Sequence, residues 1–219
     1  MITNFDTDFE EIKKLQWFPW IGKNYSKNGL LILGESHYED GDEWQKGNKL
    51  TSRIITQKRY ENIKGKWDLH RNVEKTVLNT DEISEVQRRN FYDNISYFNL
   101  VQRLLDSRKR DHRPTDDDFD EGWEVFFDVI EILEPRFVLV LGKASYGRLG
   151  FYLNNSQENW IKEENDSNPN EKIFNLKKND KRVKILFINH PSGSWGFDYK
   201  KWALLVEEEF KDEKKGLMI

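Results

Sequence analysis

The chain has 219 residues, of which 37% are hydrophobic, 14% aromatic and 34% charged, and its formal net charge is −4. This composition is typical of a folded domain with a sizeable core and argues against wholesale disorder. Cysteine is absent, which excludes disulfides, thiolate nucleophiles, cysteine-ligated zinc and iron–sulfur clusters. A small negative charge gives no global attraction to nucleic acid, so any such binding must depend on local basic patches.

The sequence predicts a cytoplasmic protein with no membrane partner. No apolar run approaches the roughly 18 residues of a membrane-spanning helix, and the first residues do not resemble a signal peptide. A length of this order is compatible with a single domain. We therefore expect one domain over residues 1–219.

The first part of the chain predicts a short helix and then a buried strand. Apolar residues near the amino end recur at helical spacing, at Phe9, Ile12, Leu15 and Phe18. The run Leu30 to Leu33 then ends at Gly34. A continuous apolar run that is closed by glycine and polar residues is typical of a strand buried on both faces of a parallel sheet.

The next segment predicts a helical insertion and a second strand. Residues 51–90 show imperfect helical spacing and are too many for a plain crossover, so we expect two or three inserted helices. Asn94 to Leu100 then contains β-favouring isoleucine, tyrosine and phenylalanine. Asn99 interrupts this apolar run near its carboxyl end.

The second half of the chain alternates helices with two further buried strands. The predicted elements are an amphipathic helix over Phe119 to Leu133, a strand over Phe137 to Leu141, a helix beginning near Lys143, a short edge strand over Lys172 to Leu176, a strand over Val183 to Ile188 and a final helix over Tyr199 to Phe210. This order predicts an α/β fold with three layers, α/β/α, around a central, mostly parallel four-stranded sheet.

Reactive or polar groups follow the carboxyl end of each predicted strand. They are Gly34 to Tyr38 (GESHY), Asn99, Gly142 with Lys143, and Asn189 to Ser192 (NHPS). In open α/β sheets ligands bind at this edge, because the loops that leave the strands converge there. We therefore expect the functional site at the carboxyl edge of the sheet.

Three kinds of chemistry could use these side chains. A serine hydrolase would need Ser36 or Ser192 beside a histidine, but the sequence has no G-x-S-x-G motif. A metal site could join His37, His190 and either Glu35 or Asp40, but no pair has the usual local ligand spacing. Recognition of a heterocycle fits better, because an amide, imidazoles and aromatic rings supply directional hydrogen bonds and a stacking surface.

Four short motifs resemble the uracil-DNA glycosylase superfamily. Members of that superfamily have an amino-terminal strand ending in G-Q-D-P-Y-H, or in G-E-A-P-G in the iron–sulfur members, and a late strand ending in H-P-S. Here the two sites read GESHY at residues 34–38 and HPS at residues 190–192. Between them, YFNLVQR and PRFVLVLGKAS resemble the family's second and third strands. The motifs keep the family's order, so the chain resembles a divergent member.

The resemblance implies a fold, an activity and a partner. The fold would be uracil-DNA-glycosylase-like, with a helical insertion at about residues 51–90. The activity would be hydrolysis of the N-glycosidic bond of a damaged or deaminated base, and the partner would be DNA or another nucleic acid, single- or double-stranded. No cofactor is expected, and without cysteine there can be no iron–sulfur cluster.

The resemblance also implies roles for individual residues. Glu35 and Ser36 would place the attacking water, and His190 would stabilise negative charge on the departing base. Asn99 would read the pyrimidine edge as a bidentate amide, and Tyr38 would pack against C5 of the base. These residues are the expected centre of the site.

Further residues complete the expected site. Gly34 and His37 belong to the first motif, and Trp44 or Phe98 would stack on the base. The residues expected to contact nucleic acid are Lys143, Ser192, which would bind a phosphate, and Trp195, which would fill the space left by an extruded base.

Two positions of the first motif depart from the family pattern. Ser36 stands where the main family has the aspartate that positions water, and His37 stands where it has proline. A hydroxyl is a poor base, so Glu35 is the available carboxylate. The alternative to an enzyme is a non-catalytic nucleic-acid or nucleotide binding protein on the same fold.

Overall fold

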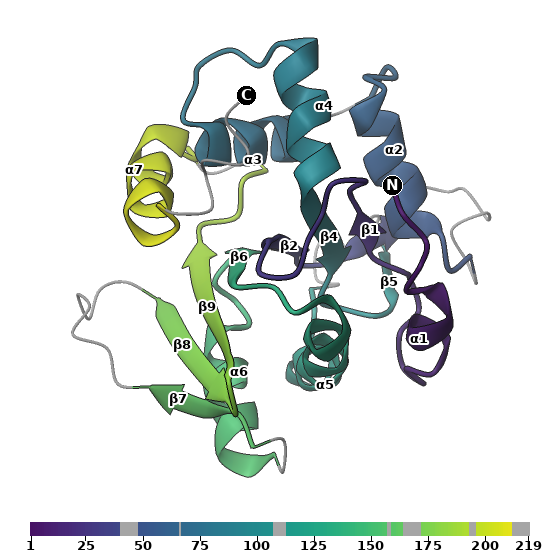
Figure 1. Cartoon of the computed structure of the whole chain (residues 1–219), viewed down its shortest axis with the longest axis vertical. Helices are drawn as coiled ribbons and strands as arrows, with labels where there is room; N and C mark the ends of the chain where they lie inside the picture. Colours follow the sequence, from purple (N-terminus) through teal and green to yellow (C-terminus); the bar gives the residue numbers. More distant parts are fainter. Residues whose placement is uncertain are drawn as a thin grey trace.

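The computed structural model of the chain describes residues 1–39, 48–65, 67–106, 113–156, 159–163, 172–192 and 196–211. Among these residues a central sheet has seven strands, in the order β1-β4-β2-β6-β9-β8-β7 (Figure 1). Their bounds are β1 Trp20–Ile21, β2 Leu30–Gly34, β4 Ile95–Asn99, β6 Phe137–Leu141, β7 Ile161–Glu163, β8 Ile173–Lys178 and β9 Lys181–Ile188. β4, β2, β6 and β9 are parallel to one another, whereas β1, β8 and β7 pair antiparallel with their neighbours.

The four strands predicted from the sequence are the four parallel strands in the middle of this sheet. The prediction of an α/β fold with a mostly parallel sheet is therefore confirmed, but the predicted size of four strands is wrong. β1 has only two residues, too few for a pattern to indicate a strand. The predicted edge strand at residues 172–176 is β8, which lies between β9 and β7 and thus not at the edge.

The parallel strands are buried on both faces because their side chains alternate between two cores. In β2, Leu31 and Leu33 belong to one core, whereas Leu30 and Ile32 belong to the other. Both pairs are nearly inaccessible to solvent. This double burial explains why the sequence of the strand is continuously apolar.

Helices cover both faces of the sheet. They are α1 Asp6–Glu10, α2 Thr51–Tyr60, α3 Asp68–Leu78, α4 Glu85–Asn94, α5 Asp116–Leu133, α6 Tyr146–Asn155 and α7 Tyr199–Glu209. Figure 1 shows α1, α5 and α6 on one side of the sheet and α3, α4 and α7 on the other. The insertion predicted at residues 51–90 contains the three helices α2, α3 and α4. No helix in the described part of the chain is long and apolar enough to cross a membrane.

Capping residues fix the start of two of these helices. Ser84 and Gln87 form a capping box at α4, and Thr115 and Asp118 form one at α5. Each box satisfies backbone N–H groups that the first helical turn leaves without partners. α6 begins at Tyr146, slightly later than the start near Lys143 that the sequence predicts.

A second, two-stranded parallel sheet continues from the carboxyl edge of the first. It consists of β3, His37–Glu39, and β5, Leu104–Asp106, with Tyr38 opposite Leu105. β3 follows β2 after two residues, and β5 follows β4 after four. This small sheet therefore places Tyr38 beside the expected site.

Candidate functional site

Gly34 and Asn99 meet at the carboxyl edge, as the sequence predicts. They are paired in the register of β2 and β4. The chains stay together just beyond the strands, because Leu100 N–H donates to the Gly34 carbonyl at 2.9 Å and Val101 N–H donates to the Glu35 carbonyl at 2.9 Å. These two hydrogen bonds hold the segments that follow β2 and β4 side by side.

Position 34 has no room for a side chain. A Cβ atom there would lie 2.0 Å from Asn99 Oδ1 and 2.6 Å from the Tyr97 hydroxyl oxygen. Both distances are far below van der Waals contact, so any residue other than glycine would displace the amide of Asn99. Glycine at this position thus allows the amide to lie directly over β2.

Glu35 and His190 approach each other over Gly142, which follows β6. A Cβ atom at Gly142 would lie 3.3 Å from Glu35 Oε2 and 3.5 Å from His190 Cδ2. Gly142 has φ +116° and donates its N–H to the Ile188 carbonyl at 3.0 Å. β6 lies between β2 and β9, so the carboxylate reaches Gly142 from one neighbouring strand and the imidazole reaches it from the other. The missing side chain at Gly142 leaves room for both groups.

Burial shifts the two titratable groups in opposite directions. Removal from water raises the pKa of Glu35 above its usual value, and the positive charge of Arg113 opposes part of this rise. Burial lowers the pKa of His190, and Arg113 lowers it further. At neutral pH His190 is therefore an uncharged imidazole beside a carboxyl group with an increased affinity for protons.

Arg113 is a site residue that the sequence analysis missed. Its Nη1 lies 3.9 Å from Glu35 Oε1 and donates to the Tyr38 hydroxyl at 3.4 Å. Its side chain is 68% exposed, and Tyr38 is 37% exposed. The arginine and the phenol therefore form an open rim above the partly buried carboxylate. In the sequence Arg113 is only the last residue of a basic cluster that begins at Arg103.

Ser36 carries a buried hydroxyl without a hydrogen bond. Its Oγ is shielded from solvent and has no partner among the residues that the structure describes. An unpaired buried hydroxyl costs about 1–3 kcal/mol. Unpaired buried hydroxyls are rare in folded proteins, and a role in binding a ligand or in a reaction is one reason to keep them.

Two residues of the expected site lie elsewhere. His37 is buried against α2, where its Nε2 lies 2.8 Å from Ser52 Oγ and its ring contacts Trp17 edge-on at 4.9 Å. Burial lowers its pKa to about 4, so it is a neutral residue of the core. Phe98 is fully buried in the core that includes α5. The ring of Phe98 therefore has no exposed face on which a base could stack, and the position of His37 gives no support to a substrate-binding role.

Lys143 lies in a group of three lysines, the lysine cluster, with Lys172 and Lys201. Lys143 Nζ lies 4.4 Å and Lys201 Nζ 5.7 Å from the centre of the Trp202 ring. Lys172 Nζ lies 4.5 Å from the centre of the Tyr146 ring. Burial lowers the pKa of Lys143, and the charges of the other two lysines lower it further. The lysine cluster is therefore a local positive patch with aromatic rings beneath it.

The H-P-S segment is held by α3. Asn72 Nδ2 donates to the Pro191 carbonyl at 2.8 Å. Ser192 is partly exposed at the same edge, where a phosphate could reach it. Trp44 and Trp195 lie outside the described residues.

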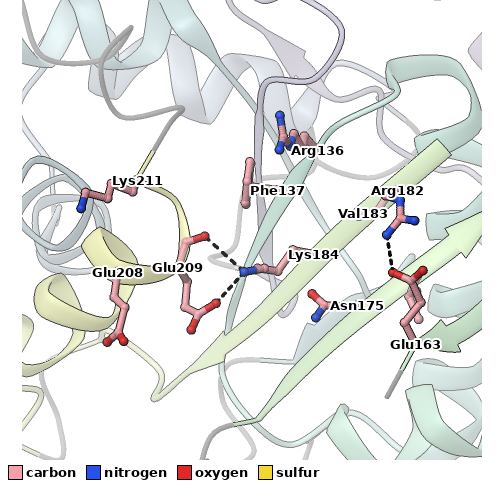
Figure 2. Close-up of a pocket in the computed structure, with 11 residues that line it drawn as sticks. Arg136, Phe137, Glu163, Asn175, Arg182, Val183, Lys184, Glu208, Glu209 and Lys211 are labelled. Atoms are coloured by element: carbon pink, nitrogen blue, oxygen red, sulfur yellow. Dashed lines mark hydrogen bonds and ion pairs between the residues drawn. The ribbon is translucent and has the colours of Figure 1, made fainter. Parts of the chain in front are cut away.

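A groove of about 430 Å³ opens at the opposite edge of the sheet, near the amino ends of β6 and β9 (Figure 2). Its charged residues include two ion pairs, Lys184 with Glu209 at 2.7 Å and Arg182 with Glu163 at 2.9 Å. These four charged groups are thus engaged in close pairs, whereas Glu35 and His190 are partly buried and Glu35 has only a long contact of 3.9 Å with Arg113. The carboxyl edge is therefore the candidate functional site.

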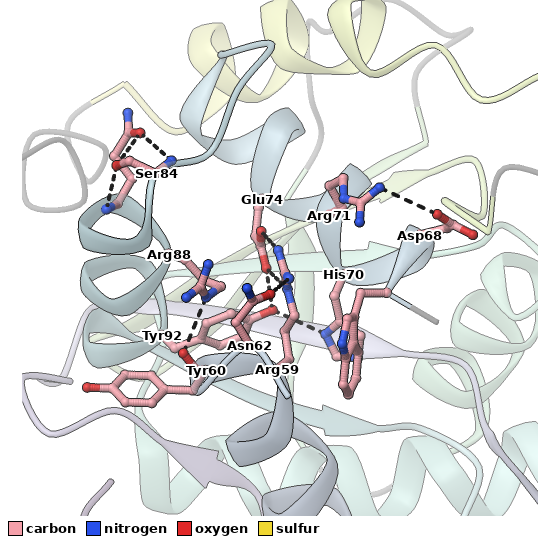
Figure 3. A network of polar contacts seen from close by, with 12 residues as sticks. Arg59, Tyr60, Asn62, Asp68, His70, Arg71, Glu74, Ser84, Arg88 and Tyr92 are labelled. Carbon is pink, nitrogen blue, oxygen red and sulfur yellow. Dashed lines mark hydrogen bonds and ion pairs between the residues drawn. The ribbon is translucent and has the colours of Figure 1, made fainter. Parts of the chain in front are cut away.

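A buried polar network lies among α2, α3 and α4 (Figure 3). Arg59 Nε donates to Glu74 Oε1 at 2.7 Å, and the Tyr92 hydroxyl donates to the same oxygen at 2.9 Å. His70 Nδ1 lies 3.2 Å from the Tyr92 hydroxyl. The His70 ring in turn lies 5.7 Å from the ring of Tyr97. The network joins α2, α3 and α4 to β4.

No model of a protein family fits the chain, and no curated protein has a significantly similar sequence. The kinship with the glycosylases is therefore a hypothesis that depends on the four motifs and the site. Within the described ranges, no three histidine, aspartate or glutamate side chains are grouped as metal ligands.

Proposed function

We propose that the protein is a uracil-DNA-glycosylase-like hydrolase that cleaves the N-glycosidic bond of a damaged or deaminated base in DNA. The observation that supports this proposal best is that Glu35 and His190 both lie against Gly142, while the amide of Asn99 lies over Gly34 at the same edge of the sheet. A carboxylate, a neutral imidazole and an amide are the groups that this hydrolysis requires.

Glu35 would act as the general base. A water oxygen attacks C1′ of the deoxyribose while Glu35 accepts a proton from that water. The raised pKa of Glu35 makes its carboxylate a stronger base than an exposed glutamate. Ser36, whose hydroxyl has no partner among the described residues, would orient the same water. In this way Glu35 takes the role that an aspartate has at the next position in the main family.

His190 would stabilise the leaving base. The bond between C1′ and the base nitrogen breaks, and the base keeps the bonding electron pair. The neutral imidazole, favoured by burial, can donate an N–H hydrogen bond to a base oxygen that becomes negative only as the bond breaks. A donor that acts on charge formed in the transition state lowers the barrier.

The remaining residues would bind the extruded nucleotide. Asn99 would contact the base edge, and Tyr38 at the open rim would pack against the ring. Arg113 is exposed beside Tyr38, and Lys143 and Ser192 lie at the same edge, so these three residues could contact phosphates.

The test is a base-release assay on defined oligonucleotides. The full chain is incubated with single- and double-stranded DNA that contains uracil, hypoxanthine or xanthine, and released base is measured by chromatography. We expect release from at least one substrate and a loss of about 100-fold or more in His190→Ala. Glu209→Gln, in the groove at the opposite edge, is the matched control and should keep full activity. If no substrate is cleaved faster than by His190→Ala, the enzymatic proposal fails.

The second candidate function is non-catalytic binding of a nucleic acid or nucleotide. The lysine cluster favours it, because basic side chains beside aromatic rings are typical of surfaces that hold single strands. This candidate predicts binding that weakens with increasing salt while every glycosidic bond stays intact.

A further inference from the structure

We infer that Tyr97 fixes the amide of Asn99 as a hydrogen-bond donor toward the ligand, so that the site selects bases with a carbonyl oxygen over bases with an amino group at the contacted position. This inference depends on the proposed function of the carboxyl edge. It assigns a specificity-determining role to Tyr97, a positioning residue that need not touch the base.

The first observation is the hydrogen bond between the two side chains. The Tyr97 hydroxyl donates to Asn99 Oδ1 at 3.1 Å. The two residues are separated by one position in β4, so both point to the same face of the sheet. They are 6% and 4% exposed. Burial raises the pKa of Tyr97, so the phenol keeps its proton and stays a donor.

The second observation is the crowding of the other side of the same oxygen. Oδ1 lies only 2.0 Å from the position that a Cβ atom of residue 34 would take. The backbone of β2 therefore covers Oδ1 on one side, and the phenol covers it on the other. A ligand has little room to donate a hydrogen bond to this oxygen.

The nitrogen of the amide is the group left for a ligand. The described residues offer no hydrogen-bond acceptor to Asn99 Nδ2. An N–H group facing a carbonyl oxygen gains a hydrogen bond, whereas an N–H group facing an amino group leaves two donors unpaired. Two hydrogen-bond donors that face each other in this way lower the affinity for the base by about 10- to 100-fold.

The position of Tyr97 is itself fixed. Its ring lies at a centroid distance of 5.7 Å from His70, and the interplanar angle is 34°. His70 is held by Tyr92 and, through it, by Glu74 and Arg59 (Figure 3). The phenol therefore cannot easily swing away from Asn99, and the orientation of the amide is set before a ligand binds.

This arrangement changes the expectation for Asn99. The sequence predicts a bidentate amide that both donates and accepts hydrogen bonds at a pyrimidine edge. With its oxygen held by Tyr97 and covered by Gly34, Asn99 offers only its N–H groups. The base would therefore be chosen by an acceptor, such as an oxo group, at one contact.

The experiment compares uracil with cytosine. Dissociation constants of the full chain are measured for single-stranded oligonucleotides with one uracil or one cytosine at the same place, under conditions that prevent cleavage. We expect the wild type to bind the uracil strand at least about 10-fold more tightly. Tyr97→Phe removes the hydroxyl that donates to Asn99 Oδ1, so the amide can rotate by 180° and present either its oxygen or its nitrogen to the base. The affinities for the two strands should then differ by less than about 3-fold. Tyr25→Phe is the matched control, because it removes a buried phenol outside this network that donates to the Leu133 carbonyl at 3.3 Å, and it should keep the wild-type ratio.

Each other outcome has a definite meaning. An unchanged ratio in Tyr97→Phe, or equal binding of both strands by the wild type, overturns this inference but leaves the proposed function standing. Binding of neither strand by the wild type contradicts the proposed function itself. If Tyr97→Phe does not fold, the side-chain amide protons of Asn99 in the wild type decide: they should shift in the NMR spectrum on addition of the uracil strand, and no shift overturns the inference.

Discussion

Glu35 and His190 lie over the same glycine, with Glu35 Oε2 3.3 Å and His190 Cδ2 3.5 Å from the position that a Cβ atom at Gly142 would occupy. The two residues come from the ends of strands on either side of β6. Their pKa values are displaced in opposite directions by the same cause, burial. Opposite displacement of neighbouring titratable groups is a recurring property of catalytic sites.

Gly142→Ala should damage this arrangement. A side chain at φ +116° is strained and would push the carboxylate and the imidazole apart. We expect the free energy of unfolding to fall by about 1–3 kcal/mol and base release to be lost. Gly147→Ala in α6 is the control, because a Cβ atom there meets nothing within 4 Å, and it should leave activity unchanged. Urea denaturation and the base-release assay measure both effects, and equal behaviour of the two variants would contradict the role of Gly142.

Arg113→Ala should shift the pH dependence of activity to higher pH. Activity requires ionised Glu35, so it rises with pH through the pKa of that residue. Arg113 opposes the rise in this pKa, and its removal should therefore move the acidic limb of the pH–rate profile upward. Arg182→Ala, which breaks an exposed ion pair with Glu163, should leave the limb in place. A downward shift in Arg113→Ala would show that Glu35 is not the base.

The protein should lose stability on mild acidification. Burial lowers the pKa of His37 to about 4 and, together with Arg59 and His37, that of His70 to about 3. Below the ordinary histidine pKa of about 6.5 the unfolded chain binds protons that the folded chain does not bind. Stability is therefore fully present above that value and falls as the pH drops toward 4, by about 1.4 kcal/mol per pH unit for each histidine.

Urea denaturation at pH 7 and pH 5 measures this loss. His37→Gln removes one of the two groups and should reduce the difference between the two pH values. Glu35, whose pKa is raised, acts in the opposite sense, because its contribution is lost as the pH rises. If the difference is the same in His37→Gln as in the wild type, His37 is not the buried neutral group described above.

Glu74→Ala should destabilise the fold strongly. Glu74 is fully buried and pairs with Arg59, which is 5% exposed. Removal of one partner leaves a buried charge uncompensated, which costs about 3–5 kcal/mol. Glu163→Ala breaks the exposed pair with Arg182 and should cost less than about 1 kcal/mol. Thermal unfolding of both variants checks the comparison, and a similar loss in the two would contradict it.

The sequence was informative where burial is continuous. The parallel strands β2, β4, β6 and β9 are apolar along their whole length because both of their faces are covered, and their ends place Gly34 and Asn99 together as predicted. The burial of Phe98 follows from the alternation of strand side chains, since its neighbour Asn99 points to the other face. The alternation of side chains along β4 could be read from the sequence, and it argues against stacking of Phe98 on a base that Asn99 contacts.

Other features depend on contacts between distant segments. His37 is buried because Ser52 and Trp17 come from elsewhere in the chain. Arg113 reaches Glu35 and Tyr38 only in the folded protein. The short strands β1, β3 and β5 have too few residues for a periodic pattern. No local pattern in the sequence could have indicated these contacts.

The most direct test of the central claim is a single-turnover measurement of base release by the wild type and Glu35→Gln. Gln keeps the size of the side chain but cannot accept a proton, so we predict a rate at least about 100-fold lower, while binding of the same oligonucleotide is retained. Glu209→Gln should release the base at the wild-type rate. Equal rates in Glu35→Gln and the wild type, or no release by the wild type from any uracil, hypoxanthine or xanthine substrate, would contradict the claim that this edge hydrolyses a glycosidic bond.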